Sequence, residues 1–177
     1  MFYKTTDFKF LDALESNWLL IKEELNRLQQ NHFTPWHEKF LYNKGWEVFG
    51  LYAFEKKLEG NCHLCPETAE LVESIPGMTT AGFSCLAPGT HILPHIGYSK
   101  AVLRSHLGLI VPDNCGIRVG NQTLNWQEGK CLIFDDTVEH EAWNKSNFPR
   151  IVLLIDFKNT NVVNSFEERY LSEITQI

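Results

Sequence analysis

The sequence predicts a mainly β fold, an antiparallel sandwich or barrel with helices packed on one outer face of a sheet. Three observations support this prediction. The chain has 177 residues, which suits one domain with a substantial core. Its first part shows helical periodicity, and from Thr79 onward it consists of short β-rich runs separated by Pro, Gly, Asn and Asp residues. Because no helix-like segment separates these runs, antiparallel pairing is favoured over a βαβ arrangement.

The N-terminal part, up to about residue 75, is expected to be helical. The segment "DFKFLDALESNWLLIKEELNRLQQN" places apolar residues three and four apart, as on one face of an amphipathic helix. Asp7 is the expected cap of this helix, and a second helix is expected over "PETAELVESI", with Pro66 in its first turn. The apolar face comprises Leu11, Leu14, Trp18, Ile21, Leu25 and Leu28.

One expected strand, "AVLRSHLGLIV", carries an informative mixture of side chains. Successive side chains of a strand point to opposite faces. One face of this strand is aliphatic and suits packing against helices, whereas the other carries Arg104 and His106 between Val102 and Ile110. A solvated strand face would explain the two polar residues, but their apolar neighbours on the same face favour a polar pocket inside a barrel. Further strands are expected over "TTAGFSCLAPG", "CGIRVGN", "KCLIFDD" and "RIVLLIDFK".

Composition and charge narrow the classes of partner and the location. The net charge of −6 argues against nucleic acid or an anionic membrane as the main partner. No run approaches the roughly 20 apolar residues needed to span a bilayer, and the start "MFYKTTDFKF" does not resemble a signal peptide. The five cysteines are an odd number, so we expect reduced thiols and a cytoplasmic location.

The sequence "CHLC" holds Cys62 and Cys65 at the spacing of a zinc or redox pair. A zinc ribbon needs a second such pair, and a redox motif sits before a helix in a βαβ unit. The sequence offers neither context, so we interpret these residues as cysteines in a loop.

Six polar residues of the β-rich half are candidates for a functional site. Taken alone, each has a structural interpretation, because a single histidine on a partly apolar segment is more often hydrogen-bonded than a ligand. Their order is more informative: a histidine near a turn, several strands, a second histidine near a turn, and an arginine on the next strand. Two imidazoles suit Fe(II), and an arginine suits a dicarboxylate. The six are Ser84, His95, Arg104, His106, His140 and Arg150.

Four segments of this half resemble a known family in their order and spacing. They are "PGTHILPHIG", "LRSHLGLIVP", "IRVGNQTLNWQEGKCLIFDDTVEHEAWN" and "FPRIVLLIDF". They resemble the core of the aspartyl/asparaginyl β-hydroxylases, which are Fe(II)- and 2-oxoglutarate-dependent oxygenases. The resemblance covers about residues 79–157 and includes an intact W-x-x-G-K to F-D-D-x-x-x-H block.

The resemblance implies a fold, cofactors and a role for each candidate residue. The fold is a double-stranded β-helix, or jelly roll. We therefore expect a single domain with a helical part over about 1–75, a jelly-roll core over about 79–157 and a C-terminal extension over 158–177. The implied cofactors are Fe(II), bound by His95 and His140, with 2-oxoglutarate as co-substrate and O2. Arg150 and Ser84 would hold the distal carboxylate of 2-oxoglutarate, and Arg104 and His106 would lie at its metal-chelating end.

Gly97 stands where most oxygenases of this kind carry a carboxylate ligand, two residues after the first histidine. The resemblance implies that glycine is usual in this branch and that water takes the coordination position. The alternative use of such a position is a halide site, as in iron halogenases. Asp135 and Asp136 are expected to shape a turn and orient His140. His91 is expected to have a structural or supporting role, and we interpret His32, His37 and His63 as surface residues.

The expected activity is hydroxylation of an unactivated C–H bond, at the β-carbon of an Asp/Asn-type residue or a related amino acid. The substrate would be a small molecule, a carrier-bound amino acid or a peptide. Val102 bears on this choice, because animal members of the family carry a further arginine at the matching position. Alternatives are hydroxylation of a lipid acyl chain, halogenation, and anion binding by a jelly roll without catalysis. Stereochemistry and oligomeric state stay open.

Overall fold

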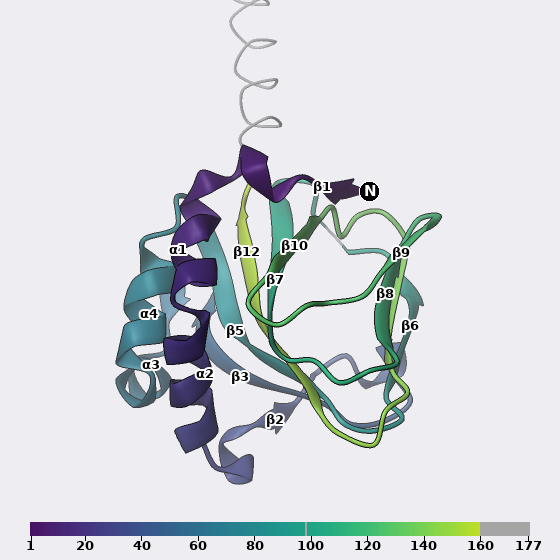
Figure 1. Ribbon diagram of the computed structural model, residues 1–177, viewed down its shortest axis with the longest axis horizontal. Coiled ribbons are helices and arrows are strands. Elements are labelled where there is room, and N and C mark those ends of the chain that lie inside the picture. The colour runs from purple at the N-terminus through teal and green to yellow at the C-terminus, as the bar shows by residue number, and fades with distance from the viewer. Residues whose placement is uncertain (98, 160–177) are drawn as a thin grey trace, which may run out of the picture.

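The computed structural model describes residues 1–97 and 99–159, and its architecture is mainly β, as predicted. Helices cover the outer face of a large sheet, and the other face of that sheet looks onto a smaller sheet (Figure 1). Every strand pair within these residues is antiparallel. The two facing sheets form the expected double-stranded β-helix.

The large sheet has the strand order β1-β10-β7-β12-β5-β3-β2, and β4 pairs with β3 at its edge. The smaller sheet has the order β6-β11-β8-β9. In the large sheet the strands are β1 (Phe2–Tyr3), β2 (Thr34–Pro35), β3 (Trp46–Ala53), β4 (Lys56–Lys57), β5 (Met78–Leu86), β7 (Val102–Ile110), β10 (Cys131–Phe134) and β12 (Arg150–Lys158). In the smaller sheet they are β6 (His91–His95), β8 (Cys115–Val119), β9 (Gln122–Leu124) and β11 (His140–Asn144).

The helices lie on the left of the large sheet in Figure 1, where α2 packs against β7 and α4 against β5. The α-helices are α1 (Asp12–Ser16), α2 (Trp18–Arg27), α3 (Glu59–Leu64) and α4 (Pro66–Glu73). Short 3₁₀ helices are η1 (Thr5–Asp7), η2 (Lys9–Leu11), η3 (Gln30–His32) and η4 (Lys39–Leu41).

The first predicted helix is not continuous. It is divided at Asn17, whose side-chain amide donates a hydrogen bond to the Ala13 carbonyl at 2.8 Å and so competes with the helical pattern. Asp7 does not cap it, because Asp7 lies in η1 and the helix α1 has no side-chain cap. The second predicted helix is confirmed as α4, with Pro66 at its first position.

The segment up to residue 75 is not wholly helical, contrary to expectation. It contributes four strands of the large sheet, among them β3, which pairs with β5 from Trp46↔Leu86 onward. The run "WEVFGLYA" is rich in aromatic and β-branched residues, which favours a strand. The large sheet therefore extends beyond the segment that resembles a known family.

The large sheet carries a hydrophobic core on each face. The core under the helices contains the apolar helix residues Leu14 and Ile21 together with the outward-facing Leu107 of β7. The core between the sheets contains Trp126 and Phe134. The alternation predicted for β7 is therefore confirmed up to Gly108, with its aliphatic face under the helices and its polar face toward the smaller sheet. It fails at Ile110, which packs against the core under the helices where the register between β7 and β12 shifts.

The cysteines are all free, and four of the five are buried. Cys62 lies inside α3, so the expectation of a loop cysteine was wrong for this residue, whereas Cys65 lies in the bend between α3 and α4, as expected. Among the helices described, none combines the length and apolar character needed to cross a membrane. The expected C-terminal extension over 158–177 lies, from residue 160 on, outside the described residues.

Candidate functional site

His95 and His140 come together because β6 ends where β11 begins. They are direct cross-strand partners in the smaller sheet, at a register shift in the β6–β11 pair. Their ring centroids lie 4.2 Å apart with an interplanar angle of 52°. A first-row metal lies about 2 Å from an imidazole nitrogen, so rings at this separation can share one ion.

The two imidazole rings are held in the same way through Nδ1. His95 Nδ1 lies 2.8 Å from the Leu93 carbonyl oxygen, and His140 Nδ1 lies 2.9 Å from the Val138 carbonyl oxygen. A carbonyl oxygen only accepts, so each Nδ1 carries the proton and each Nε2 keeps a lone pair. The hydrogen bond that orients the His140 ring through Nδ1 therefore comes from the Val138 carbonyl and not from an aspartate carboxylate, while the backbone of the neighbouring Asp136 also contacts the ring.

Burial keeps His140 neutral. Desolvation and then the neighbouring His95 lower its pKa from 6.5 to about 4. A neutral imidazole is the form that binds metals, so the ring is ready to act as a ligand at physiological pH.

Gly97 leaves room for the side chain of Asp136. A Cβ built at Gly97 would lie 2.5 Å from Cγ and Oδ2 of Asp136, and the Gly97 amide donates to the Asp136 carbonyl at 2.7 Å. Across residues 1–97 and 99–159, no group of three His, Cys, Asp or Glu side chains could hold a metal ion. A metal at this site would therefore have to be held by fewer than three such side chains from the described residues.

Asp135 and the histidines outside the six candidates are held by contacts of their own. Asp135 shapes the turn before β11 as expected, since its Oδ1 accepts from the backbone and hydroxyl of Thr137 at 2.9 and 2.6 Å. His91 sits at the opposite end of β6, with Nε2 2.7 Å from Glu141. Two of the three histidines interpreted as surface residues are exposed, His37 and His63, while His32 is half-buried against Phe49.

Arg150, at the start of β12, is the most unusual charged residue of the site. It is only 1% exposed, and among the described residues no carboxylate forms an ion pair with it. Its guanidinium lies 4.4 Å from the Trp126 ring centroid, and one Nη donates to the Ser84 carbonyl at 3.4 Å. Burial lowers its pKa to about 10, so it remains charged at neutral pH. A buried cation in this state favours the binding of an anion.

Two groups with available protons lie close to Arg150. Ser84 Oγ accepts from the Trp46 indole at 3.1 Å and can still donate its own proton. His106 Nδ1 accepts from the Trp126 indole at 3.3 Å, which places the ring proton on Nε2. His106 Nε2 and Arg150 Nε are both buried without a hydrogen-bond partner among the described residues.

Aromatic side chains connect this anion-binding end with the imidazole pair. The Phe134 ring centroid lies 5.2 Å from that of His106 and 5.5 Å from that of His140. A ligand between Arg150 and the two histidines would therefore lie against Phe134 and Trp126, in surroundings that exclude water.

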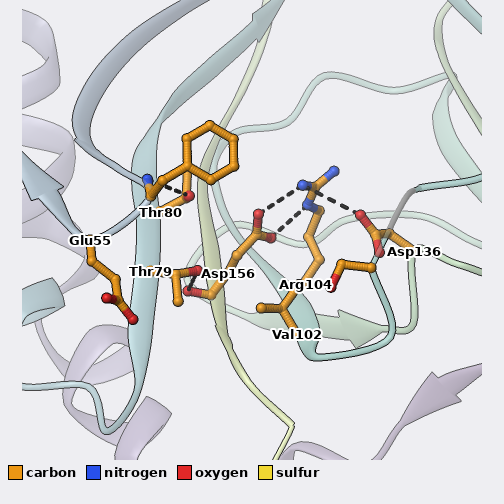
Figure 2. A pocket seen from close by; sticks show the side chains of 9 residues that line it. Glu55, Thr79, Thr80, Val102, Arg104, Asp136 and Asp156 are labelled. Carbon is orange, nitrogen blue, oxygen red and sulfur yellow. Dashed lines mark hydrogen bonds and ion pairs between the residues drawn. The ribbon is translucent and has the colours of Figure 1, made fainter.

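Arg104 is paired with two carboxylates. Its Nε and Nη2 donate to Asp156 at 2.7 and 2.8 Å, and Nη2 lies 3.5 Å from Asp136 (Figure 2). Desolvation raises the pKa of Asp136, and Arg104 opposes this rise. The sequence reasoning missed Asp156, although its position on β12, six residues after Arg150, places both on the same face of the strand.

A cavity of about 300 Å³ adjoins this ion-pair cluster (Figure 2). Its rim includes the two-residue turn Phe54–Glu55 between β3 and β4, which the sequence reasoning also missed. No sequence signal marks this turn, because both residues adopt positive φ angles, 49° and 67°, without being glycine or asparagine. Its lining also includes Thr80, Ser99, Val102, Arg104, Asp136 and Asp156.

Sequence comparison connects the chain with known hydroxylases. The profile of the aspartyl/asparaginyl β-hydroxylases matches residues 15–160. An ornithine lipid ester-linked acyl 2-hydroxylase of Rhizobium tropici is 42% identical over 166 residues, which cover 88% of this chain and 59% of that protein. An aspartyl/asparaginyl β-hydroxylase of Homo sapiens is 36% identical over 157 residues, which cover 84% of this chain and 21% of that protein. The chain thus spans less than two thirds of the length of either relative.

Structure comparison agrees on the fold. A prolyl hydroxylase of Trichoplax adhaerens, solved with a hypoxia inducible factor peptide, superposes with a TM-score of 0.58 at 14% identity, covering 82% of this chain and 80% of that one. A prolyl-4-hydroxylase of Pseudomonas putida gives a TM-score of 0.52 at 14% identity, covering 84% and 87%. At this identity the likeness concerns the fold alone.

Proposed function

Because the chain belongs to the aspartyl/asparaginyl β-hydroxylase family, we propose that it is an Fe(II)- and 2-oxoglutarate-dependent hydroxylase of an unactivated C–H bond. The observation that carries this proposal is the buried charge of Arg150, which has a hydrogen-bonding nitrogen without a partner among the described residues. Such a group suits the distal carboxylate of a dicarboxylic acid, to which guanidinium can donate two parallel hydrogen bonds. The two neighbouring imidazoles then suit the metal.

His95 and His140 are the proposed iron ligands. Both present a lone pair on Nε2, since both Nδ1 atoms are bonded to backbone carbonyls. When bound, Fe(II) with 2-oxoglutarate and O2 supplies the oxidant for the C–H bond, and the protein supplies positioning and electrostatics. The two carbonyl contacts fix the direction in which each Nε2 points.

The proposed 2-oxoglutarate site runs from Arg150 to the imidazole pair. Ser84 and Arg150 hold the distal carboxylate, because both offer protons in a buried setting. His106 lies between Arg150 and His140, and its Nε2, which has no hydrogen-bond partner among the described residues, donates toward the end of the molecule that chelates the metal. Arg104 would lie at the same end, as the resemblance implies, with its guanidinium already paired with Asp156 and Asp136.

As substrate we propose an Asp/Asn-type residue or a related amino acid, free, carrier-bound or in a peptide. A lipid acyl chain is the second candidate. It is favoured by the 42% identity with the Rhizobium relative. It is also favoured by Val102, because an uncharged residue at this position of the cavity lining provides no second cation to bind an acidic side chain. Halogenation ranks lower, because the Asp136 carboxylate fills the space beside Gly97 and would repel a halide. We also propose a cytoplasmic location, which suits five free thiols.

Iron titration with matched variants tests the ligand assignment. We expect the full chain to bind one Fe(II) and to convert 2-oxoglutarate to succinate, slowly without substrate. His95→Ala and His140→Ala should lose iron binding, whereas His91→Ala should keep it, because His91 is held by Glu141 at the far end of β6. Retained iron binding in both ligand variants would contradict the assignment. If 2-oxoglutarate binds but is not converted to succinate, the result would instead support the alternative of an anion-binding protein without catalysis.

A further inference from the structure

Trp126 contacts two buried groups of the proposed 2-oxoglutarate site at once. It is itself only 3% exposed and lies between β9 and β10. Its indole N–H donates to His106 Nδ1 at 3.3 Å, and the Arg150 guanidinium lies over its ring, 4.4 Å from the centroid. One side chain therefore holds two groups that come from different strands, β7 and β12.

The segment that carries Trp126 is fixed to β7 through its main chain. The Gly129 amide donates to the Gly108 carbonyl at 2.9 Å. A side chain at Gly108 would collide with the Gln127 carbonyl oxygen, so the segment lies against the face of β7 to which this position points. Because residues two apart on a strand share a face, it is also the face that carries His106. The backbone thus brings the indole beside the imidazole.

The indole N–H determines which nitrogen of His106 faces a ligand. A neutral imidazole can carry its proton on either nitrogen, and the hydrogen bond at one nitrogen selects the position. His106 Nε2 is buried and has no partner among the described residues, so the indole bond at Nδ1 is the contact that makes this selection. An Nε2–H donates to a carboxylate, whereas a lone pair at the same place would repel it.

The ring of Trp126 holds the Arg150 guanidinium without neutralising it. A guanidinium over an indole is attracted to the ring face, and the attraction is stronger in a desolvated setting. The other contact of this guanidinium is weak, because one Nη donates to the Ser84 carbonyl at 3.4 Å, and Nε has no partner among the described residues. A carboxylate in place of the ring would cancel the charge, whereas the ring leaves it available to an anion.

We propose that Trp126 is the positioning residue of the 2-oxoglutarate site. Its N–H directs the proton of His106, and its ring directs the guanidinium of Arg150, toward the same bound dicarboxylate. The two donors then act together, because both depend on one side chain. This inference rests on the proposed function, since it assigns a further residue of the same site.

Replacing the indole N–H alone tests the contact with His106. Benzothienylalanine keeps the shape of tryptophan with sulfur in place of N–H, and suppression of a stop codon introduces it at position 126. Calorimetry measures 2-oxoglutarate binding to the full chain, loaded with Fe(II) under nitrogen. We expect the affinity to fall at least about fivefold, which corresponds to one hydrogen bond. A fall of less than about twofold would overturn the proposal.

Trp143 provides the matched control for this replacement. It follows Ala142, which belongs to the core between the sheets, so its side chain points to the outer face of the smaller sheet. Benzothienylalanine at position 143 should leave the 2-oxoglutarate affinity within about twofold of the wild type. A fall as large as that at position 126 would show a general effect of the analogue and would overturn the proposal.

A double-mutant cycle tests whether Trp126 acts through His106. Trp126→Phe removes the N–H and keeps an aromatic ring near Arg150, and His106→Leu removes the acceptor. Trp126→Phe should weaken 2-oxoglutarate binding at least about fivefold in the wild type and less than about twofold in the His106→Leu background. Equal effects in the two backgrounds would overturn the proposal.

The contact with Arg150 is tested by removing the ring. Trp126→Leu should weaken 2-oxoglutarate binding at least about threefold beyond Trp126→Phe, because the guanidinium then loses its aromatic partner. Equal affinities of these two variants would overturn the role of the ring.

The imidazole nitrogen signals of the ligand-free chain give a readout that a loss of packing alone would not produce. Nuclear magnetic resonance of isotope-labelled histidine near neutral pH should show His106 protonated on Nε2, with Nδ1 as a hydrogen-bonded acceptor. His106→Leu identifies these signals. Benzothienylalanine at position 126 should move the Nδ1 signal to that of a free acceptor or of a protonated nitrogen. An unchanged Nδ1 signal, or a wild-type ring protonated on Nδ1, would overturn the proposal.

The outcomes for the two proposals are distinguishable. If 2-oxoglutarate binds the wild type and the cycle shows no coupling, the inference about Trp126 fails and the proposed function stands. If 2-oxoglutarate does not bind the wild type while the Nδ1 signal of His106 responds as expected, the proposed function fails and Trp126 positions these donors for another anion.

Discussion

The six candidate residues differ in how far their own surroundings indicate a ligand. Arg150 gives the strongest indication, because a fully buried guanidinium without a carboxylate partner among the described residues is unfavourable by itself. His106 and Ser84 follow, since each is buried with a proton to donate. Arg104 gives a weaker indication, because two carboxylates already neutralise it.

Replacing Arg150 tests its proposed role, because a ligand that binds the folded chain raises the free energy of unfolding. In the wild type, 2-oxoglutarate should raise the free energy of unfolding by about 2.7 kcal/mol at 100 times its Kd. Arg150→Met should abolish this gain, because the distal carboxylate loses its partner. The control Arg118→Met removes an arginine that pairs with Glu139 and Glu141 on the smaller sheet and should keep the gain. Chemical denaturation with and without 2-oxoglutarate measures both, and an unchanged gain in Arg150→Met would count against the site.

Gly97→Asp should not create a useful third ligand. Its side chain would collide with the Asp136 carboxylate, so we expect the free energy of unfolding of the metal-free protein to fall by about 1–3 kcal/mol. Gly60→Asp is the control, since a Cβ there meets nothing within 4 Å.

Adding Asp136→Ala to Gly97→Asp should recover at least about half of that loss, because the two side chains compete for one space. Tighter iron binding by Gly97→Asp alone, without loss of stability, would show that the space is available.

His106 should make the metal-free protein less stable in acid. Burial, followed by the charges of Arg150 and Arg104, lowers its pKa well below 6.5. As the pH falls below 6.5, the unfolded chain gains a proton that the folded chain does not, so the free energy of unfolding decreases, by up to about 1.4 kcal/mol per pH unit. His140 acts in the same direction. His106→Gln should therefore roughly halve the slope in urea unfolding from about pH 6 to about pH 5, and an unchanged slope would contradict the assignment of His106 as neutral.

The sequence alone identified the candidate metal- and anion-binding residues but not the residues that surround them. His95, His140 and Arg150 could be proposed because their types and order are informative. Asp156 and Phe54 could not, because their significance arises from pairing with Arg104 and from a turn between β3 and β4. These are contacts between residues distant in the sequence, which a single sequence does not reveal.

At the scale of elements, strand register positions the site. His95 and His140 meet because β6 and β11 pair at these two residues, and a slip by one residue would turn one ring to the opposite face. The shift of register directly after His140 is a feature that often accompanies functional sites in sheets. Alternation along β7 was predictable because its period of two is visible in the sequence. The strand β3 was missed because it precedes the segment that carries the family resemblance.

The Phe54–Glu55 turn allows a prediction about strain. Two-residue hairpins with positive φ at both positions favour Asn-Gly, and side chains such as phenylalanine are disfavoured there. Phe54→Asn combined with Glu55→Gly should raise the free energy of unfolding by about 1 kcal/mol. Thermal unfolding measures this effect. A loss of stability would show that the turn is not strained.

At the scale of the molecule, the large sheet separates two environments. The helices and one core close its outer face, and the second core with the candidate site lies between the sheets. The overall two-sheet architecture was predictable from the β-rich runs. The division of the N-terminal helix and the strands before residue 75 were not, because tertiary pairing determined them rather than local periodicity.

The most direct test of the whole proposal is an anaerobic titration of the Fe(II)-loaded chain with 2-oxoglutarate. The metal-to-ligand charge-transfer absorption of the complex is measured at each step. We expect the band to saturate at one 2-oxoglutarate per chain in the wild type and to be absent in His140→Ala. Saturable 2-oxoglutarate binding that is equally strong without Fe(II) and gives no such band would contradict shared coordination of one metal by His95 and His140.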